Sequence, residues 1–178
     1  MRVLVTAASR HEATAELAAA IAAALRRRDI EAQARPISEV AEVGGYDAVV
    51  LGSAVYVGRW LREARRFAES NATTLATMPV WLFSSGPVGP GGESGPADAD
   101  TLAELTGARE HRVFAGRLDR QGLDLGERLL VRLARVPARD DRDWAAVEEF
   151  AADIAYALED EEGAGAVREQ VGSRVGST

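Results

Sequence analysis

Short apolar runs alternate with amphipathic stretches along most of this chain. Three runs are apolar almost throughout, which is typical of strands buried on both faces of a sheet: Arg2–Ala7, Tyr46–Ser53 and Pro79–Ser85. The segment 31–37 instead alternates polar and apolar residues and contains Pro36. Because proline cannot donate to a central hydrogen-bond ladder, this segment is expected to be an edge strand. A fifth strand is predicted over Glu110–Leu118.

Helical periodicity accounts for most of the chain between these strands. In the segment Glu12–Arg28, apolar residues recur at i, i+4 and i+8 and give one core-facing stripe. Similar patterns predict helices over Arg59–Asn71, Asp98–Leu105, Gly122–Val136 and Asp143–Leu158. From Glu159 the chain becomes polar and glycine-rich. We therefore expect one domain over residues 1–158, followed by a disordered C-terminal tail over 159–178.

The order of these elements predicts the class of fold. Strands that alternate with helices form a parallel sheet with helices on both faces, joined by right-handed crossovers. Five strands suit a doubly wound sheet in the order 2-1-3-4-5, within a three-layer α/β/α sandwich. In such sheets ligands bind outside the carboxyl ends of the strands, at the switch point between the first and third strands.

Composition narrows the range of functions. The chain has 178 residues, a net charge of −7 and no cysteine. The negative charge argues against a nucleic-acid binder, and the lack of cysteine excludes disulfides and thiolate metal sites. Only His11 and His111 are present, which argues against a histidine-rich metal site; His111 is interpreted as a structural or exposed residue of its strand. No apolar run approaches ~18 residues, and the N-terminus lacks signal-peptide features, so a cytoplasmic location is expected.

Three loops follow the first, third and fourth predicted strands, and the topology places all three at one edge of the sheet. The first loop combines hydroxyl groups with the start of a helix, where unpaired N–H groups favour an anion such as a phosphate. A simple helix cap is the alternative interpretation. The candidate ligand residues are Ser9, Arg10, His11, Glu12, Ala13 and Thr14 in the first loop, Ser53, Ala54, Val55, Tyr56, Val57 and Gly58 in the second, and Ser84, Ser85, Gly86 and Pro87 in the third.

The second and third loops suggest what kind of phosphate compound would bind. The second loop supplies small residues for close backbone approach and one aromatic side chain, Tyr56, that can stack on a flat ring. The third loop supplies serine and glycine for backbone contacts to the edge of a ring. A phosphate pocket, a stacking face and a polar ring edge together describe a site for flavin mononucleotide (FMN). The sequence offers no convincing protein acid or base, so the flavin itself would be the redox centre.

Three segments resemble a known family. Gly52–Gly58 resembles the second FMN loop of the flavodoxin-like family, and more closely of its menaquinone-dependent protoporphyrinogen oxidase branch. Phe114–Leu118 and Asp143–Ala151 look like the last strand and the closing helix of that branch. The resemblance implies a flavodoxin fold, bound FMN, and two-electron oxidation of protoporphyrinogen IX in heme biosynthesis, with a quinone or another redox partner as acceptor.

One departure from the family pattern bears on whether FMN binds. Glu12 and Ala13 stand where the phosphate loop of the family usually has a glycine and a second hydroxyl residue. A carboxylate repels a phosphate, and the loss of glycine disfavours a positive φ. The protein is therefore alternatively a flavodoxin-like fold that has lost FMN and acts as a binding module. A flavodoxin-type FMN electron carrier without its own substrate is a separate alternative, which does not depend on Glu12.

The predicted helix within residues 124–136 suggests a further contact. Its leucines lie along one face and its arginines along another, as in helices that rest on an anionic membrane surface. Peripheral contact with the inner face of the membrane is one interpretation. Packing of the leucines on the sheet, or at the interface of a homo-oligomer, is the other.

Overall fold

The computed structural model describes residues 1–10, 12–86, 95–115 and 142–175. Within these ranges the chain alternates strands and helices, as the apolar pattern predicts. The elements are β1 (Arg2–Ala8), α1 (Ala13–Arg26), β2 (Glu31–Pro36), the 3₁₀ turn η1 (Ile37–Glu39), β3 (Ala48–Tyr56), β4 (Arg59–Trp60), α2 (Arg62–Leu75), β5 (Val80–Gly86), α3 (Ala99–Thr106), β6 (Glu110–Ala115) and α5 (Trp144–Val175).

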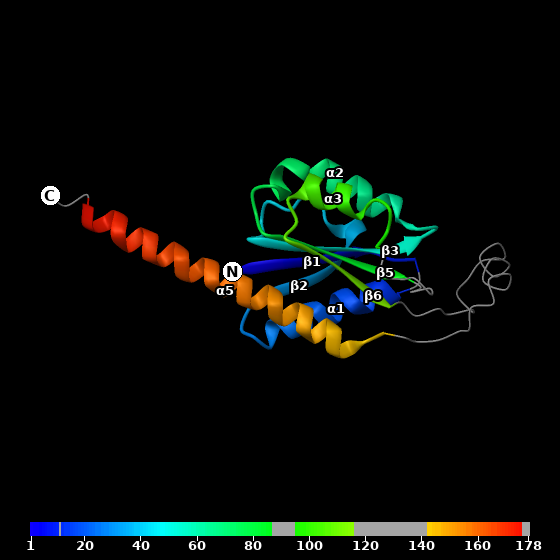
Figure 1. Cartoon of the computed structure of the whole chain (residues 1–178), viewed down its shortest axis with the longest axis horizontal. Coiled ribbons are helices and arrows are strands. Elements are labelled where there is room, and N and C mark those ends of the chain that lie inside the picture. The colour runs from blue at the N-terminus through cyan, green and yellow to red at the C-terminus, as the bar shows by residue number, and fades with distance from the viewer. Residues whose placement is uncertain (11, 87–94, 116–141, 176–178) are drawn as a thin grey trace.

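The sheet has the predicted doubly wound order. Its path is β2-β1-β3-β5-β6, and every neighbouring pair along this path is parallel. This is the expected order 2-1-3-4-5, because the two-residue strand β4 pairs only with β3. The proline-bearing strand β2 lies at the edge, as expected. Helices α1 and α5 cover one face and α2 and α3 the other, which completes the three-layer sandwich (Figure 1).

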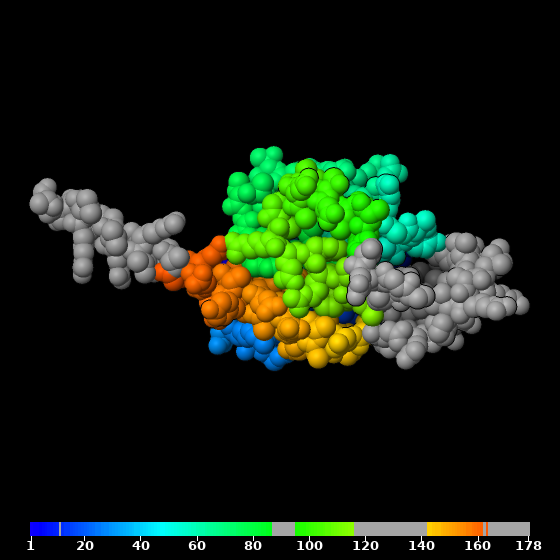
Figure 2. All heavy atoms as spheres, viewed as in Figure 1, coloured from blue at the N-terminus to red at the C-terminus, as the bar shows by residue number. Residues whose placement is uncertain are grey.

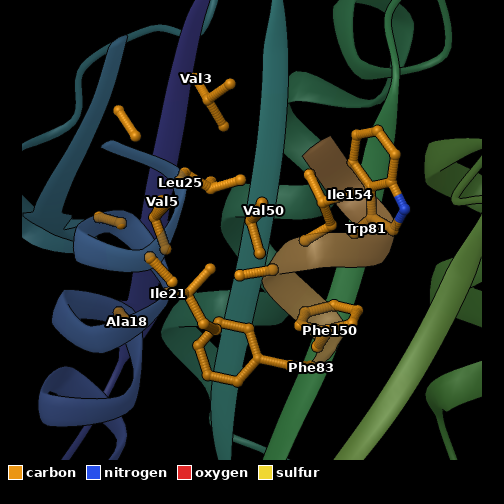
Figure 3. Close-up of a cluster of buried hydrophobic side chains, with 14 of the residues drawn as sticks. Val3, Val5, Ala18, Ile21, Leu25, Val50, Trp81, Phe83, Phe150 and Ile154 are labelled. Carbon is orange, nitrogen blue, oxygen red and sulfur yellow. The ribbon is translucent and has the colours of Figure 1, made fainter. Parts of the chain in front are cut away.

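Each face of the sheet buries its own apolar core. On the α1/α5 face, side chains from both helices close over the central strands (Figure 3). Phe83, Phe114 and Phe150 form an edge-to-face series there, with ring centroids 6.1 Å and 5.7 Å apart. On the other face, Trp60 and Phe67 pack with leucines from β1, β3 and β5. Both helix layers are therefore held by continuous apolar contact with the sheet.

The segment after β3 differs from the prediction. A helix was expected from Arg59, but Arg59–Trp60 forms β4, and α2 begins at Arg62. The chain reverses through the two-residue turn Val57–Gly58, where φ is 50° and 70°. Positive φ at both central residues is the requirement of a type I′ hairpin. The sequence does not indicate this turn, because such turns usually carry Asn-Gly or Asp-Gly and a β-branched valine gives no such signal.

Replacing Val57 with asparagine is expected to stabilise the protein by about 1 kcal/mol. The valine side chain is 83% exposed, so it gains little from burial, while its positive φ is strained. Asparagine tolerates this conformation. Urea unfolding measures the change. Val113→Asn is the matched control, because Val113 lies on β6 and is not among the residues with positive φ. An equal gain in both variants would contradict the role assigned to the turn.

Helix α5 is longer than its apolar stripe. Among the side chains of α5 that the structure describes, the last buried one is Leu158, where the predicted apolar stripe ends, but the helix continues to Val175. Its second half projects beyond the sheet (Figure 1). Residues 159–175, for which the sequence predicts a disordered tail, are therefore helical. This segment contains four glutamates, which have high helix propensity, and three glycines, which do not, and it extends a helix that is already nucleated by packing.

The edge strand β6 lies against the first half of α5 (Figure 2). Arg112 on β6 pairs with Asp153 on the helix at 3.0 Å. Beyond Ala115, the remainder of the predicted strand up to Leu118 and the predicted helix Gly122–Val136 lie outside the described residues. Among the helices that the structure describes, none is long and apolar enough to cross a membrane.

Candidate functional site

Three loops leave the sheet side by side at the carboxyl ends of β1, β3 and β5. In the register of the sheet, Ala8 lies opposite Ser53, and Ser53 lies opposite Ser84. The strands run in the same direction and end at the same edge (Figure 1). We call this edge the rim. The topology therefore brings together the three loops that the sequence predicts as a site.

The first rim loop leads directly into α1. Ser9 and Ala13 are half-buried, Arg10 is exposed, and Thr14 is buried. Glu12 is the N-cap of α1, with φ 55° and ψ −28°, and its side chain makes no capping hydrogen bond. The first-turn N–H groups of α1 are thus not capped by this carboxylate, which leaves them suited to an anion. His11 lies outside the described residues.

One arginine belongs to the first loop, and a second pairs with the first turn of the helix that follows it. The Arg10 guanidinium lies 4.8 Å from the centre of the Tyr56 ring, a cation–π contact that joins the first loop to the second. Arg142, which precedes α5, forms an ion pair with Glu16 in the first turn of α1. Arg142 thus offsets one carboxylate close to the helix N-terminus. The sequence did not identify Arg142, since 126 residues separate it from Glu16.

The second loop presents an aromatic side chain and an apolar tip. Tyr56 and Val57 are 38% and 83% exposed, and Gly58 is exposed beside them, whereas Ala54 and Val55 are half-buried. The Ser53 hydroxyl is buried, accepts the Leu61 N–H and donates to the Ala54 carbonyl, both at 2.9 Å. Ser53 therefore fixes the path from the hairpin into α2. Tyr56 and Val57 are the side chains of this loop that reach the surface.

The third loop begins with two buried serines. The Ser84 hydroxyl accepts the indole N–H of Trp60 at 2.7 Å and is hydrogen-bonded to Nε2 of His111 at 2.7 Å. Ser85 is also buried. Gly86 is half-buried, and a Cβ at this position would lie 2.9 Å from Cβ of Val55, so glycine permits the close approach of the two strands. Pro87 lies outside the described residues.

His111 has a more specific environment than the sequence suggested. Burial lowers the pKa of its imidazole, and the nearby carboxylates of Asp100, Asp98 and Glu110 oppose this effect without reversing it. The ring therefore favours the neutral state near pH 7. Its partner Ser84 is 27 residues away in the chain. A sequence pattern cannot identify such a contact, because it depends on how β5 and β6 are aligned.

The doubly wound sheet and the loops at its rim define a flavodoxin-like α/β protein. The chain matches the Flavodoxin domain family over residues 4–144 and belongs to that family. No curated protein matches the sequence.

Solved flavodoxins share this fold at low sequence identity. A flavodoxin from the domain Archaea is 16% identical with a TM-score of 0.62, and the alignment covers 89% of this chain and 99% of that one. Flavodoxin 1 from Bacillus cereus is 18% identical with a TM-score of 0.60, covering 85% and 95%. The flavodoxin from Streptococcus pneumonia TIGR4 is 17% identical with a TM-score of 0.60, covering 88% and 99%.

Membership of the flavodoxin family implies FMN as the cofactor, and the rim can be tested for its fit. Three observations agree: a helix N-terminus that its N-cap side chain leaves uncapped, an exposed aromatic ring on the next loop, and a glycine that brings the third loop close. One observation disagrees: the carboxylate of Glu12 is exposed at the N-terminus of α1, where the phosphate would bind. Since backbone N–H groups rather than side chains dominate such anion sites, the residues present fit FMN.

Proposed function

We propose that this protein binds FMN at the rim and serves as an electron carrier. The observation that carries the proposal is the in-register meeting of three loops at the ends of β1, β3 and β5. The first of these loops leads into a helix N-terminus that the side chain of its N-cap residue, Glu12, leaves uncapped. Bound FMN would supply the redox chemistry, and the protein would supply position and electrostatics.

Each loop would have a separate task. The backbone N–H groups of Ala13 and Thr14, in the first turn of α1, would bind the phosphate. The ring of Tyr56 would stack on the flavin, as its exposure on the second loop allows. The backbone at Ser85 and Gly86 would meet the polar edge of the ring. These roles need no ionisable catalytic group from the protein.

The protoporphyrinogen oxidase activity remains a second candidate. It is supported by the resemblance of Gly52–Gly58 to the second FMN loop of that branch. The flavodoxins with which the chain shares its fold are not named as protoporphyrinogen oxidases. A quinone acceptor, peripheral membrane contact and a homo-oligomer stay predictions, and the segment 124–136 lies outside the described residues. Turnover of protoporphyrinogen IX with a quinone analogue by the FMN-loaded protein would distinguish this enzyme from a carrier.

FMN binding is expected after incubation and desalting, seen as flavin absorbance and quenched flavin fluorescence. Tyr56→Ala is expected to weaken the affinity by about tenfold, since aromatic stacking contributes about 1–3 kcal/mol. Tyr156→Ala is the matched control, because Tyr156 is 75% exposed on α5 and is expected to leave binding unchanged. Absence of any flavin signal in the wild-type protein would refute the proposed cofactor. Equal affinities of Tyr56→Ala and the wild type would remove only the stacking role.

A further inference from the structure

A hydrogen-bonded cluster lies directly behind the rim and joins three strands. The indole Nε1–H of Trp60 on β4 donates to Oγ of Ser84 on β5 at 2.7 Å. The same oxygen lies 2.7 Å from Nε2 of His111 on β6. Trp60 and Ser84 are buried, and the rings of Trp60 and His111 meet edge to face with centroids 6.3 Å apart. These contacts place an ionisable group one hydrogen bond from the third loop.

The two hydrogen bonds at Ser84 are best satisfied by one protonation state of His111. An indole can only donate, so the Ser84 oxygen accepts from Trp60. The Ser84 hydroxyl can then donate its own hydrogen to Nε2 of His111, which requires a neutral imidazole with its proton on Nδ1. A protonated imidazole would donate to Ser84 instead. The hydroxyl hydrogen would then lack an acceptor at a fully buried position, which is unfavourable.

The same cluster anchors the segment Gly95–Asp98, which follows the third loop. The Ala97 N–H donates to the Gly58 carbonyl at 2.9 Å. The backbone N–H of Trp60 donates to Oδ1 of Asp98 at 3.2 Å. A Cβ on Gly95 would lie 3.2 Å from Cε1 of His111, so the imidazole lies close against the backbone there. The β3–β4 hairpin and the start of α3 are thus tied to each other around His111.

The charged groups around His111 come from the elements packed on it. Asp98 and Asp100 lie at the start of α3, and Glu110 lies on β6 itself. Arg65 on α2 partly balances Asp98, at 3.7 Å. These carboxylates favour a charged imidazole, and burial opposes it more strongly. The His111 imidazole would therefore become charged only at a pH below the ordinary histidine pKa.

We propose that neutral His111 is a positioning residue that holds the second and third rim loops in their FMN-binding arrangement, and that protonation of His111 weakens FMN binding. The inference rests on the proposed FMN site at the rim. His111 acts through Ser84 and Trp60 and needs no contact with the flavin.

The linkage between His111 and the loops can be tested without FMN. The chain has three tryptophans and two histidines, so its indole and imidazole NMR signals are few. We expect the indole N–H signal of Trp60, assigned with Trp60→Phe, to shift as His111 titrates below the ordinary histidine pKa of about 6.5. The shift should be absent in His111→Gln, in which an amide oxygen can accept from Ser84 without titrating. A Trp60 signal that ignores the titration of His111 would overturn the proposal.

FMN affinity gives the second readout. In the wild-type protein the dissociation constant is expected to rise more between about pH 7.5 and about pH 5.5 than in His111→Gln, by no more than about tenfold, because burial holds the pKa of His111 below about 6.5. The comparison of the two proteins cancels the ionisation of the FMN phosphate, whose second pKa is about 6. Riboflavin, which lacks the phosphate, should show the same difference between them. Identical pH profiles in the two proteins would overturn the proposal.

The outcomes separate the two hypotheses. If wild-type protein binds FMN with the same pH profile as His111→Gln, the FMN site stands and the role of His111 fails. If no FMN binds at any pH, the proposed function fails, and the role of His111 in FMN binding fails with it, even where the Trp60 signal still follows the titration. Ser84→Ala serves as a second variant in case His111→Gln fails to fold. It should bind FMN more weakly than wild type at neutral pH and lose the extra dependence on pH.

Discussion

Replacing Gly52 with alanine is expected to destabilise the fold by about 3 kcal/mol, near the upper end of overpacking costs, and to lower Tm by roughly 10 °C. Gly52 lies on β3 directly opposite Phe83 on β5. A Cβ on Gly52 would lie 2.1 Å from Cζ of Phe83 and within 2.5 Å of two further ring atoms. The ring cannot move aside easily, because it is fully buried and packs edge to face on Phe114. The Phe83 ring lies on the α1/α5 face of the sheet, in the core around Ile21 (Figure 3).

Urea or thermal unfolding, followed by far-UV circular dichroism, measures the loss. Gly44→Ala is the matched control, because a Cβ there meets nothing within 4 Å, and it should change stability little. Phe83→Leu would remove ring atoms at the point of overlap. The double variant should therefore lose less stability than the sum of the two single variants, with a coupling of about 1–2 kcal/mol. Additive losses would show that the overlap with Phe83 is not the cause.

The sheet could be predicted from the sequence because its central strands have a strong and simple pattern. The apolar runs at Arg2–Ala7, Tyr46–Ser53 and Pro79–Ser85 are typical of strands covered on both faces, and Pro36 marks the edge. The alternation with helices then leaves few possible topologies. The hairpin after β3 could not be predicted, because Val57 adopts a backbone conformation that valine rarely takes and Trp60 fits a helical stripe equally well.

The candidate site was predictable in its position and less so in its detail. The topology places the three loops at one edge whatever their sequence. The partners of Ser53 and Ser84 depend on the alignment of strands and on the hairpin, neither of which has a sequence signature. Both hydroxyls, which the sequence suggested as ligand groups, make hydrogen bonds inside the protein. The same limitation hid the pairing of Arg142 with Glu16.

Replacing Glu12 with glycine is expected to raise the affinity for FMN by about tenfold and to stabilise the protein by about 1 kcal/mol. The two effects have different causes. The affinity rises because an exposed carboxylate is removed from the N-cap of α1, beside a phosphate that carries a charge of about −2. The stability rises because a residue with φ 55° is strained unless it is glycine. Flavin fluorescence titration and urea unfolding measure them separately.

Glu12→Gln separates charge from backbone strain. Glutamine removes the charge but keeps a side chain at the positive φ, so its affinity for FMN should rise as in Glu12→Gly while its stability stays near that of the wild type. Riboflavin has no phosphate, and its affinity should be the same in all three proteins. A parallel rise in riboflavin affinity would show that Glu12 acts on the ring or on the loop as a whole. In that case repulsion between the Glu12 carboxylate and the phosphate would not be the cause of the change in affinity.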